Sequence, residues 1–312
     1  MSGLAFLFPG QGSQFQGMGR DLATAFPEAK AVYDRADAAL APFHLPISRV
    51  SFEGSEEELK RTAVTQPAIL VHSVAVFEVL KARGLAPVLL AGHSLGEWSA
   101  LVAAGALTLE DAVVLVHRRG TFMQEAVAVG QGAMSAVIGL DGPAVAAACA
   151  EIAGETGEAV SAANFNSPEQ TVIAGTAGAV AKASELLKQR GAKRVLPLPV
   201  SAPFHCALMK PAEEKLAPFL DAAPFADLSV PVVTNVDVLA NLSGGEAREA
   251  LRRQVCSPVR WVETVDRLSR ETAGAIEVGP GTVLAGLARR IAKDWSVRTT
   301  SDAEGVRRLL AG

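Results

Sequence analysis

Residues 92–96 of this 312-residue chain read Gly-His-Ser-Leu-Gly, a G-x-S-x-G motif. The apolar residues 87–91 before it predict a buried strand, and residues 97–104 after it have helical composition and spacing. A serine at such a strand-to-helix turn is a nucleophile elbow, in which the flanking glycines allow a sharp turn between closely packed elements. The turn would present the Ser94 hydroxyl at the positive end of a helix, which indicates covalent acyl transfer.

A serine hydroxyl needs a base to accept its proton, and the chain has five histidines. His93 adjoins Ser94, so its side chain should point away from the hydroxyl. His205 ends a proline-rich loop where the chain returns between two predicted domains, and such a loop can place a side chain across a cleft. We therefore predict His205 as the base. No histidine follows it, which argues against the serine–acid–histidine order of α/β-hydrolases and leaves a backbone carbonyl to orient the imidazole in a Ser–His dyad.

Residues 8–14, Phe-Pro-Gly-Gln-Gly-Ser-Gln, form a second glycine cluster after the first predicted strand. The cluster lacks the lysine of a Walker loop and the spacing of a dinucleotide site, so neither kind of phosphate binding is expected. In an acyl-transfer enzyme, backbone N–H groups of such a loop can form half of an oxyanion hole. The N–H group of Leu95, directly after the serine, would form the other half.

Two arginines, Arg118 and Arg119, lie on an apolar helix after the elbow. A guanidinium near the pocket would bind a carboxylate in bidentate fashion, while the other arginine would face solvent. No group of histidines, cysteines or acids has the spacing of metal ligands, so we predict no metal and no cofactor.

Composition limits the class of protein. Hydrophobic residues make up 49% and charged residues 20%, as in a globular protein with one large core and a smaller subdomain. The net charge of −4 argues against general nucleic-acid binding. We expect no membrane span and no signal peptide, because no apolar run is judged long enough to cross a bilayer and residues 1–8 are interpreted as a first strand. Three cysteines favour a reducing cytoplasm over a disulfide framework. Basic clusters after residue 245 are interpreted either as solvated helix faces or as a docking surface for an acidic or phosphorylated partner.

The order of elements predicts an α/β fold with a parallel sheet. Strands are expected at 3–8, 87–91, 230–234 and 274–278, and helices at 18–40, 66–83, 95–104, 109–126, 208–222 and 246–256, with one long helix after residue 281. From residue 130 the pattern becomes β-α-β-β-α-β, the split βαβ of a ferredoxin-like unit. Its strands are expected at 134–140, 159–164, 170–175 and 192–198, and its helices at 142–153 and 177–190. This divides the chain into a main domain of residues 1–129 and 199–312 and an insertion of residues 130–198.

With these residues assembled, the chain resembles the malonyl-CoA:acyl carrier protein transacylases, the acyltransferase family of fatty acid and polyketide synthesis. The resemblance covers nearly the whole chain and depends on several spaced motifs. These are residues 8–14, Thr-Gln-Pro-Ala at 65–68, Gly-His-Ser-Leu-Gly-Glu at 92–97, Arg-Arg-Gly at 118–120 with Met-Gln at 123–124, Asn-Phe-Asn-Ser-Pro at 164–168, Pro-Phe-His-Cys-Ala-Leu-Met at 203–209, Ser-Pro-Val-Arg-Trp at 257–261 and Glu-Val-Gly-Pro-Gly at 277–281.

The resemblance implies an α/β-hydrolase-like domain with a ferredoxin-like insertion. It also implies transfer of a malonyl group from coenzyme A, through a serine ester, to the phosphopantetheine thiol of acyl carrier protein. The implied roles are these: Ser94 as nucleophile, His205 as base, the amides of Gln11 and Leu95 as oxyanion hole, Arg119 as clamp for the malonyl carboxylate, the carbonyl at or near Gln254 as partner of His205, and Gln66, Met123 and Asn164 lining the cleft. Phe204 before the histidine favours malonyl over methylmalonyl. Trp98 replaces the tyrosine of many relatives.

Other functions stay open at this point. A serine esterase or thioesterase shares the elbow but would need a late histidine and an acid. A non-catalytic docking module for acyl carrier protein would carry a dead pocket. Cys206 is a rival nucleophile, although a small buried thiol is its expected role. The carrier protein could serve fatty acid or polyketide synthesis, and the family favours a monomer.

Overall fold

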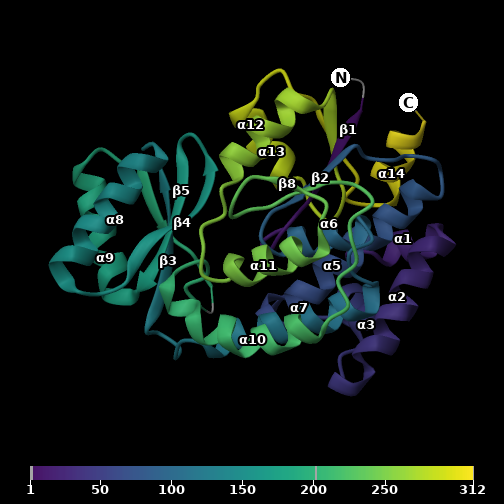
Figure 1. Cartoon of the computed structure of the whole chain (residues 1–312), viewed down its shortest axis with the longest axis horizontal. Coiled ribbons are helices and arrows are strands. Elements are labelled where there is room, and N and C mark those ends of the chain that lie inside the picture. The colour runs from purple at the N-terminus through teal and green to yellow at the C-terminus, as the bar shows by residue number, and fades with distance from the viewer. Residues whose placement is uncertain (1–2, 201, 312) are drawn as a thin grey trace.

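The computed structural model describes residues 3–200 and 202–311, which form two separate sheets flanked by helices (Figure 1). The larger sheet has the strand order β10 (Val297–Thr299), β9 (Gly274–Glu277), β1 (Leu4–Phe8), β2 (Leu89–Gly92), β7 (Val232–Val233) and β8 (Ala240–Asn241). Its first five strands are parallel, whereas β8 pairs antiparallel with β7. The predicted α/β class is confirmed, but the sheet is mixed rather than wholly parallel.

The smaller sheet is antiparallel and lies apart from the larger one, on the left of Figure 1. Its strand order is β4 (Val160–Ser167), β5 (Gln170–Thr176), β3 (Gly132–Ile138) and β6 (Arg194–Pro197). Two helices, α8 (Gly142–Thr156) and α9 (Ala177–Gln189), pack on this sheet around a small core of their own. The predicted order of two helices and four strands is therefore present.

Helices cover both faces of the larger sheet. Side chains alternate along strand β1, and because those on both faces are apolar, each face must be buried. Phe6 and Phe8 face a core built largely from helices, while Ala5 and Leu7 face a second core that contains Trp261. The helices of the main body are α1 (Arg20–Ala25), α2 (Pro27–Leu40), α3 (Ile47–Glu53), α4 (Glu56–Lys60), α5 (Thr62–Lys81), α6 (Leu95–Ala103), α7 (Leu109–Glu125), α10 (Lys210–Ala222), α11 (Gly244–Gln254), α12 (Trp261–Glu271), α13 (Val283–Ile291) and α14 (Ala303–Leu310), with short 3-10 turns at Ala41–Phe43 and Ala207–Met209.

Helix α5 corrects two predictions. By length and composition this helix could cross a membrane, contrary to the expectation that no run is long enough, but 94% of its apolar window is buried as a core helix. It also begins four residues before the predicted start, with Pro67 inside it. Pro67 has no N–H group for the carbonyl of Ala63, and the Nδ1 atom of His117 bonds that oxygen instead, at 2.9 Å.

The predicted long C-terminal helix is wrong. Helix α13 ends at Ile291, and the chain then adds strand β10 beside β9 before α14 begins. The Asp302 side chain accepts a hydrogen bond from Gly305 and caps this last helix. Sequence spacing missed β10 because only its pairing with β9 makes so short a segment a strand. Helices α3, α4 and α12 were also not predicted.

The hairpin of the smaller sheet is tighter than expected. Strand β4 continues to Ser167 with two register shifts, so that Pro168 and Glu169 alone connect it to β5. Residues 165–167, which lie outside the strand predicted at 159–164, are thus part of β4. An isolated parallel bridge joins Asn164 of this strand to Val259 of the main body, so β4 contacts the main body at this point.

The turn between β2 and α6 is strained and closely packed. Ser94 has φ 50° and ψ −103°, a backbone conformation that a non-glycine residue adopts only under structural constraint. A β-carbon on Gly92 would lie 1.9 Å from the carbonyl carbon of Gly96, and one on Gly96 would lie 1.9 Å from the carbonyl oxygen of Phe8. Both glycines are therefore needed for close approach rather than for their own φ angles.

Replacing Gly96 by alanine should destabilise the fold by about 3 kcal/mol, because the new methyl group meets strand backbone that cannot rotate away. Urea unfolding followed by circular dichroism measures this change. Gly154→Ala is the matched control, since nothing lies within 4 Å of its β-carbon position in α8. That control should be stabilising by about 0.5–1 kcal/mol. Equal effects of the two substitutions would contradict the packing argument.

Candidate active site

The Ser94 hydroxyl meets the imidazole of His205 across the space between the elbow and a distant loop. Its Oγ atom lies 2.7 Å from Nε2 of His205. The two residues are 111 positions apart in the chain, and both have positive φ angles, 50° and 60°. The predicted pair is therefore within hydrogen-bond reach.

The other nitrogen of His205 faces backbone carbonyls rather than an acid. Nδ1 lies 3.0 Å from the carbonyl oxygen of Gln254 and 3.2 Å from that of Ser257. Gln254 is the last residue of α11, and the last carbonyls of a helix lack partners within the helix. These acceptors favour the tautomer with hydrogen on Nδ1, which leaves Nε2 free to accept a proton. Burial, reinforced by the Arg119 charge, lowers the pKa of His205 to about 3.

Arg119 of α7 is the third group at this point, and its side chain is only 1% exposed. Its Nη1 donates to Oε1 of Gln66 at 2.8 Å, and its Nη2 donates to Oε1 of Gln254 at 3.0 Å and to Ser94 Oγ at 3.2 Å. Its Nε has no recorded partner among the described residues. Burial lowers the pKa of Arg119 to about 10, so the guanidinium is still charged at neutral pH. Its direct partners are neutral, which suits a site for an anion.

A buried polar network supports the elbow from behind. Glu97 Oε2 accepts hydrogen bonds from the backbone N–H of Asn235 at 2.9 Å and from Nε2 of Gln254 at 2.8 Å. Asn235 in turn accepts from the N–H of Ser94 at 2.7 Å and donates to the carbonyl of Gly92 at 2.7 Å. Burial raises the pKa of Glu97 to about 7, against the opposing effect of these hydrogen bonds and of Arg119.

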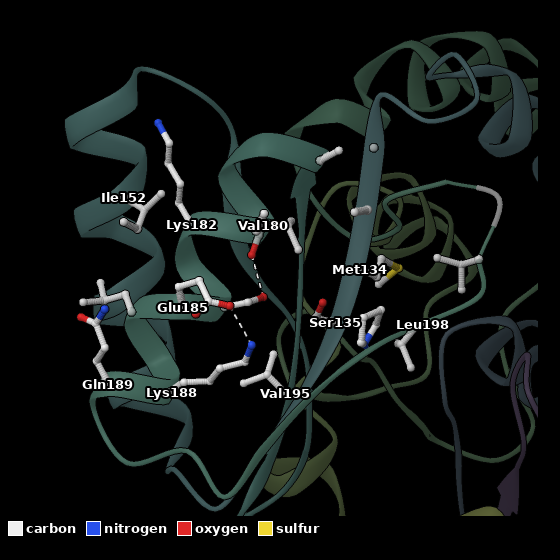
Figure 2. A pocket seen from close by; sticks show the side chains of 18 of the residues that line it. Met134, Ser135, Ile152, Val180, Lys182, Glu185, Lys188, Gln189, Val195 and Leu198 are labelled. Atoms are coloured by element: carbon white, nitrogen blue, oxygen red, sulfur yellow. Dashed lines mark hydrogen bonds and ion pairs between the residues drawn. The ribbon is translucent and has the colours of Figure 1, made fainter.

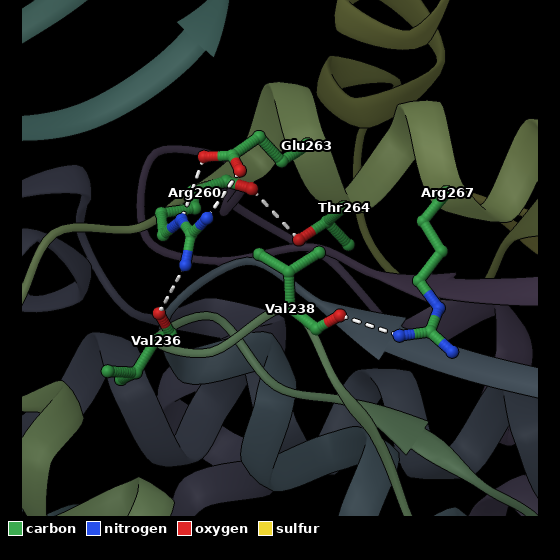
Figure 3. A network of polar contacts seen from close by, with 6 residues as sticks. All are labelled: Val236, Val238, Arg260, Glu263, Thr264 and Arg267. Carbon is green, nitrogen blue, oxygen red and sulfur yellow. Dashed lines mark hydrogen bonds and ion pairs between the residues drawn. The ribbon is translucent and has the colours of Figure 1, made fainter.

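Two arginines hold the segment that carries Asn235 (Figure 3). Arg260 donates to the carbonyl of Val236 at 3.1 Å, and Arg267 donates to that of Val238 at 2.8 Å. Val238 has φ 58°, which an unconstrained β-branched residue avoids. The segment is thus fixed in a strained conformation beside the serine.

The two backbone amides predicted to form the oxyanion hole, those of Gln11 and Leu95, follow the neighbouring strands β1 and β2. Leu95 opens helix α6, and Gln11 lies in the loop after β1, whose Gly10 packs closely against the His93 carbonyl. Among the described residues, no acceptor is recorded for the N–H of Leu95 or of Gln11. The side chain of Gln11 donates instead to the hydroxyl of Thr62 at 3.4 Å.

The remaining predicted site residues differ in how closely they join this cluster. Met123 is buried, and its sulfur lies 3.8 Å from Nε2 of Gln66. Asn164 and Phe204 are buried, but within the described residues neither hydrogen-bonds to Ser94, His205 or Arg119. Cys206 donates its thiol to the carbonyl of Pro203 and is buried, which raises its pKa to about 11.

Sequence reasoning missed Asn235, the role of Glu97 and the partner of His93. His93 points away from the serine as predicted, and its Nε2 lies 2.8 Å from Oδ1 of Asn166 on β4. Asn235 follows β7 at the carboxyl edge of the parallel strands, where polar residues commonly build sites, and that position was the available signal. Glu97 adjoins the elbow motif, but nothing in its spacing indicates which way it turns.

A cavity of about 850 Å³ lies elsewhere, beside the smaller sheet (Figure 2). Side chains of β3, α9 and the segment after β6 line it, among them Met134, Val180 and Leu198. Ser94, His205 and Arg119 do not line this cavity. Within residues 3–200 and 202–311 no group of three or more histidines, cysteines or acids could hold a metal ion. The cluster around Ser94 is therefore the candidate site, because nucleophile, base and cation meet there.

Comparison with known proteins agrees with this geometry. Residues 5–307 match the family model described as acyl transferase domain. The chain is 48% identical to the malonyl CoA-acyl carrier protein transacylase of Bacillus subtilis over 98% of this chain and 96% of that protein. It is 50% identical to the protein of the same name from Escherichia coli K12 over 93% of each.

Solved structures give the same result. An acyl carrier protein S-malonyltransferase from Vibrio cholerae superposes with a TM-score of 0.95 at 46% identity, over 99% of this chain and 100% of that one. A malonyl-transacylase solved in complex with a type II PKS acyl-carrier protein also has a TM-score of 0.95, at 47% identity over 99% of both chains. The chain belongs to the acyl transferase domain family and, within it, to the malonyl CoA-acyl carrier protein transacylases.

Proposed function

We propose that this protein transfers a malonyl group from malonyl-CoA to the phosphopantetheine thiol of acyl carrier protein through a malonyl ester of Ser94. The 2.7 Å contact between Ser94 Oγ and His205 Nε2 carries the proposal. It is supported by the Arg119 guanidinium 3.2 Å from the same oxygen and by relatives named for this activity.

In the first half of the reaction, His205 Nε2 accepts the Ser94 proton as Oγ attacks the thioester carbonyl. The N–H groups of Gln11 and Leu95 stabilise the oxyanion of the tetrahedral intermediate. Collapse of the intermediate breaks the carbon–sulfur bond, and the imidazolium returns its proton to the departing coenzyme A thiolate.

In the second half, His205 accepts the proton of the phosphopantetheine thiol, whose sulfur attacks the malonyl ester. The intermediate collapses with return of the proton to Ser94 Oγ. The backbone carbonyl of Gln254 holds the imidazole throughout, so a Ser–His dyad suffices. The thioester malonyl-CoA and the thiol of acyl carrier protein react in turn, in a ping-pong sequence.

Arg119 binds the malonyl carboxylate in this proposal. Its direct protein partners are the neutral amides of Gln66 and Gln254 and the Ser94 hydroxyl, so a carboxylate entering the site meets an uncompensated charge. Gln66 orients the guanidinium and Met123 packs beside it. Asn164 and Phe204 line the cleft, and the ring of Phe204 excludes an α-methyl group.

The finer description of the fold belongs to the same proposal. We infer that residues 1–129 and 199–312 form an α/β-hydrolase-like domain and that residues 130–198 are a ferredoxin-like insertion. The strand order β4-β5-β3-β6, with helices after β3 and β5, supports this division. We also propose that the protein acts as a monomer in the cytoplasm and needs no cofactor besides its coenzyme A substrate. Acyl carrier protein is its proposed partner, as it is for the malonyl-transacylase of the solved complex.

A serine thioesterase or esterase is the competing enzyme. It would use the same Ser94 and His205 but would transfer the malonyl group to water and release free malonate. Such a hydrolase would orient its histidine with an acid, whereas backbone carbonyls are the partners of His205 here. A non-catalytic docking module has less support, because nucleophile, base and cation are all in contact.

Incubation with malonyl-CoA should add one malonyl group to Ser94, seen as a mass increase of the intact protein and mapped by peptide sequencing. Addition of holo-acyl carrier protein should then remove the label and yield malonyl carrier protein. Ser94→Ala should take no label, and Cys206→Ser should be labelled normally. Accumulation of free malonate would identify a thioesterase, and a wild-type protein that stays unlabelled would favour the docking module.

Arg119→Ala should lower the preference for malonyl-CoA over acetyl-CoA by about 10²-fold to 10³-fold, because the buried carboxylate loses its charged partner. Initial rates of Ser94 acylation with the two thioesters measure the preference. Arg118→Ala is the matched control, since its guanidinium lies over the Phe219 ring at 4.1 Å. An Arg119→Ala variant with unchanged preference would show that Arg119 does not bind the malonyl carboxylate.

The lowered pKa of His205, about 3, predicts a base that stays neutral in mild acid. Because a depressed pKa moves protonation to lower pH, inactivation of the free enzyme by an uncharged sulfonyl fluoride should not slow as the pH falls from 7 to 5. An inflection near pH 6.5, the value for an ordinary histidine, would show that His205 is not desolvated in solution.

A further inference from the structure

We propose that Glu97 is a positioning residue for malonyl selectivity, acting on Arg119 through the side-chain amide of Gln254. The inference rests on the proposed function of Arg119 and goes beyond it. Glu97 makes no hydrogen bond to the serine hydroxyl or to the guanidinium, but it accepts one from the Gln254 amide, whose oxygen accepts from the guanidinium.

Gln254 is the centre of this arrangement, because its amide has a donor end and an acceptor end of nearly equal shape. Nε2 donates to Glu97 Oε2 at 2.8 Å and to the Ser94 carbonyl at 3.1 Å. Oε1 accepts from Arg119 Nη2 at 3.0 Å. A reversed amide would set its NH₂ group against the guanidinium and its oxygen against Glu97 Oε2, which also accepts the Asn235 N–H, so Arg119 and Glu97 jointly hold one orientation.

At the start of α6, the Glu97 side chain bonds Gln254 rather than the end of its own helix. Glu97 is the third residue of α6, from which a glutamate commonly bonds the N–H of the residue before the helix. Here that N–H, on Ser94, is bonded by Asn235 instead. Glu97 therefore reaches across to α11 and to the backbone of Asn235.

Burial makes the placement of this carboxyl group costly without a function. Glu97 is 1% exposed, and its Oε1 has no recorded partner among the described residues. A carboxyl group loses favourable hydration when it is buried, whereas an apolar side chain at the same position would not. Gln254 links Glu97 to Arg119 in the hydrogen-bond network, so the carboxyl group can orient the guanidinium without neutralising it by direct contact. An arginine paired directly with a protein carboxylate would resist the substrate carboxylate.

The test is a pair of variants of matched size in the full-length protein. Glu97→Met removes the acceptor and should lower the preference for malonyl-CoA over acetyl-CoA by about tenfold, read from rates of Ser94 acylation. Glu97→Gln keeps an acceptor oxygen for Gln254 and should retain the preference within about threefold. Loss of stability alone would lower both rates alike and leave their ratio unchanged.

Combination with Arg119→Ala gives the decisive readout. If Glu97 acts through Arg119, then Glu97→Met has no further effect on the preference in the Arg119→Ala background, and the same holds for Gln254→Met. An effect that persists in that background, or a Glu97→Met variant with unchanged preference, overturns the inference. Should Glu97→Met fail to fold, Glu97→Asp, which withdraws the carboxyl group from Gln254, should also lower the preference.

The two levels of the proposal fail differently. A wild-type protein that takes no malonyl label, or an Arg119→Ala variant that keeps its preference, contradicts the proposed function itself. A different result contradicts only the inference about Glu97. In that case the wild-type protein is labelled normally and Arg119→Ala loses its preference, but Glu97→Met changes the preference independently of Arg119.

Discussion

The hydrogen bond between Ser94 Oγ and His205 Nε2 is the interaction on which the rest of the structure depends. A hydroxyl and an imidazole 111 residues apart must stay within 2.7 Å, although each backbone has a positive φ angle. Strain of this kind persists only where surrounding structure enforces it. Close packing of Gly92 and Gly96 holds the first residue, and the end carbonyl of α11 holds the second.

The positive charge beside this pair, on Arg119, has neutral hydrogen-bond partners. Arg119 is buried against two glutamine amides, and the nearest buried carboxyl group stands one amide away. Such an arrangement keeps the guanidinium oriented but electrostatically unsatisfied, which is the condition for binding an anionic acyl group tightly in a site of low dielectric. Desolvation, reinforced by the same positive charge, lowers the pKa of His205 and keeps its imidazole neutral.

The sequence predicted much of the fold where the signal was local. Apolar runs and helical spacing located most strands of both sheets, and the elbow motif located the serine and its helix. Predictions failed where neighbours decide the outcome. Strand β10 exists through its pairing with β9, residues 165–167 are extended because β5 lies beside them, and Pro67 is tolerated inside α5 because His117 bonds the carbonyl that the proline cannot.

By itself the sequence determined which chemistry was available: a serine between glycines, a histidine in the loop between two predicted domains, an arginine on the next helix, and motifs shared with a known family. Residue types and short spacings carry that information because they act within a turn or a helix. The tertiary structure alone decided which polar groups meet, namely that Asn235 bonds the Ser94 amide, that Glu97 turns to Gln254, and that carbonyls rather than an acid orient His205. Hydrogen bonds between segments 49 to 157 residues apart depend on packing in three dimensions, which no local pattern encodes.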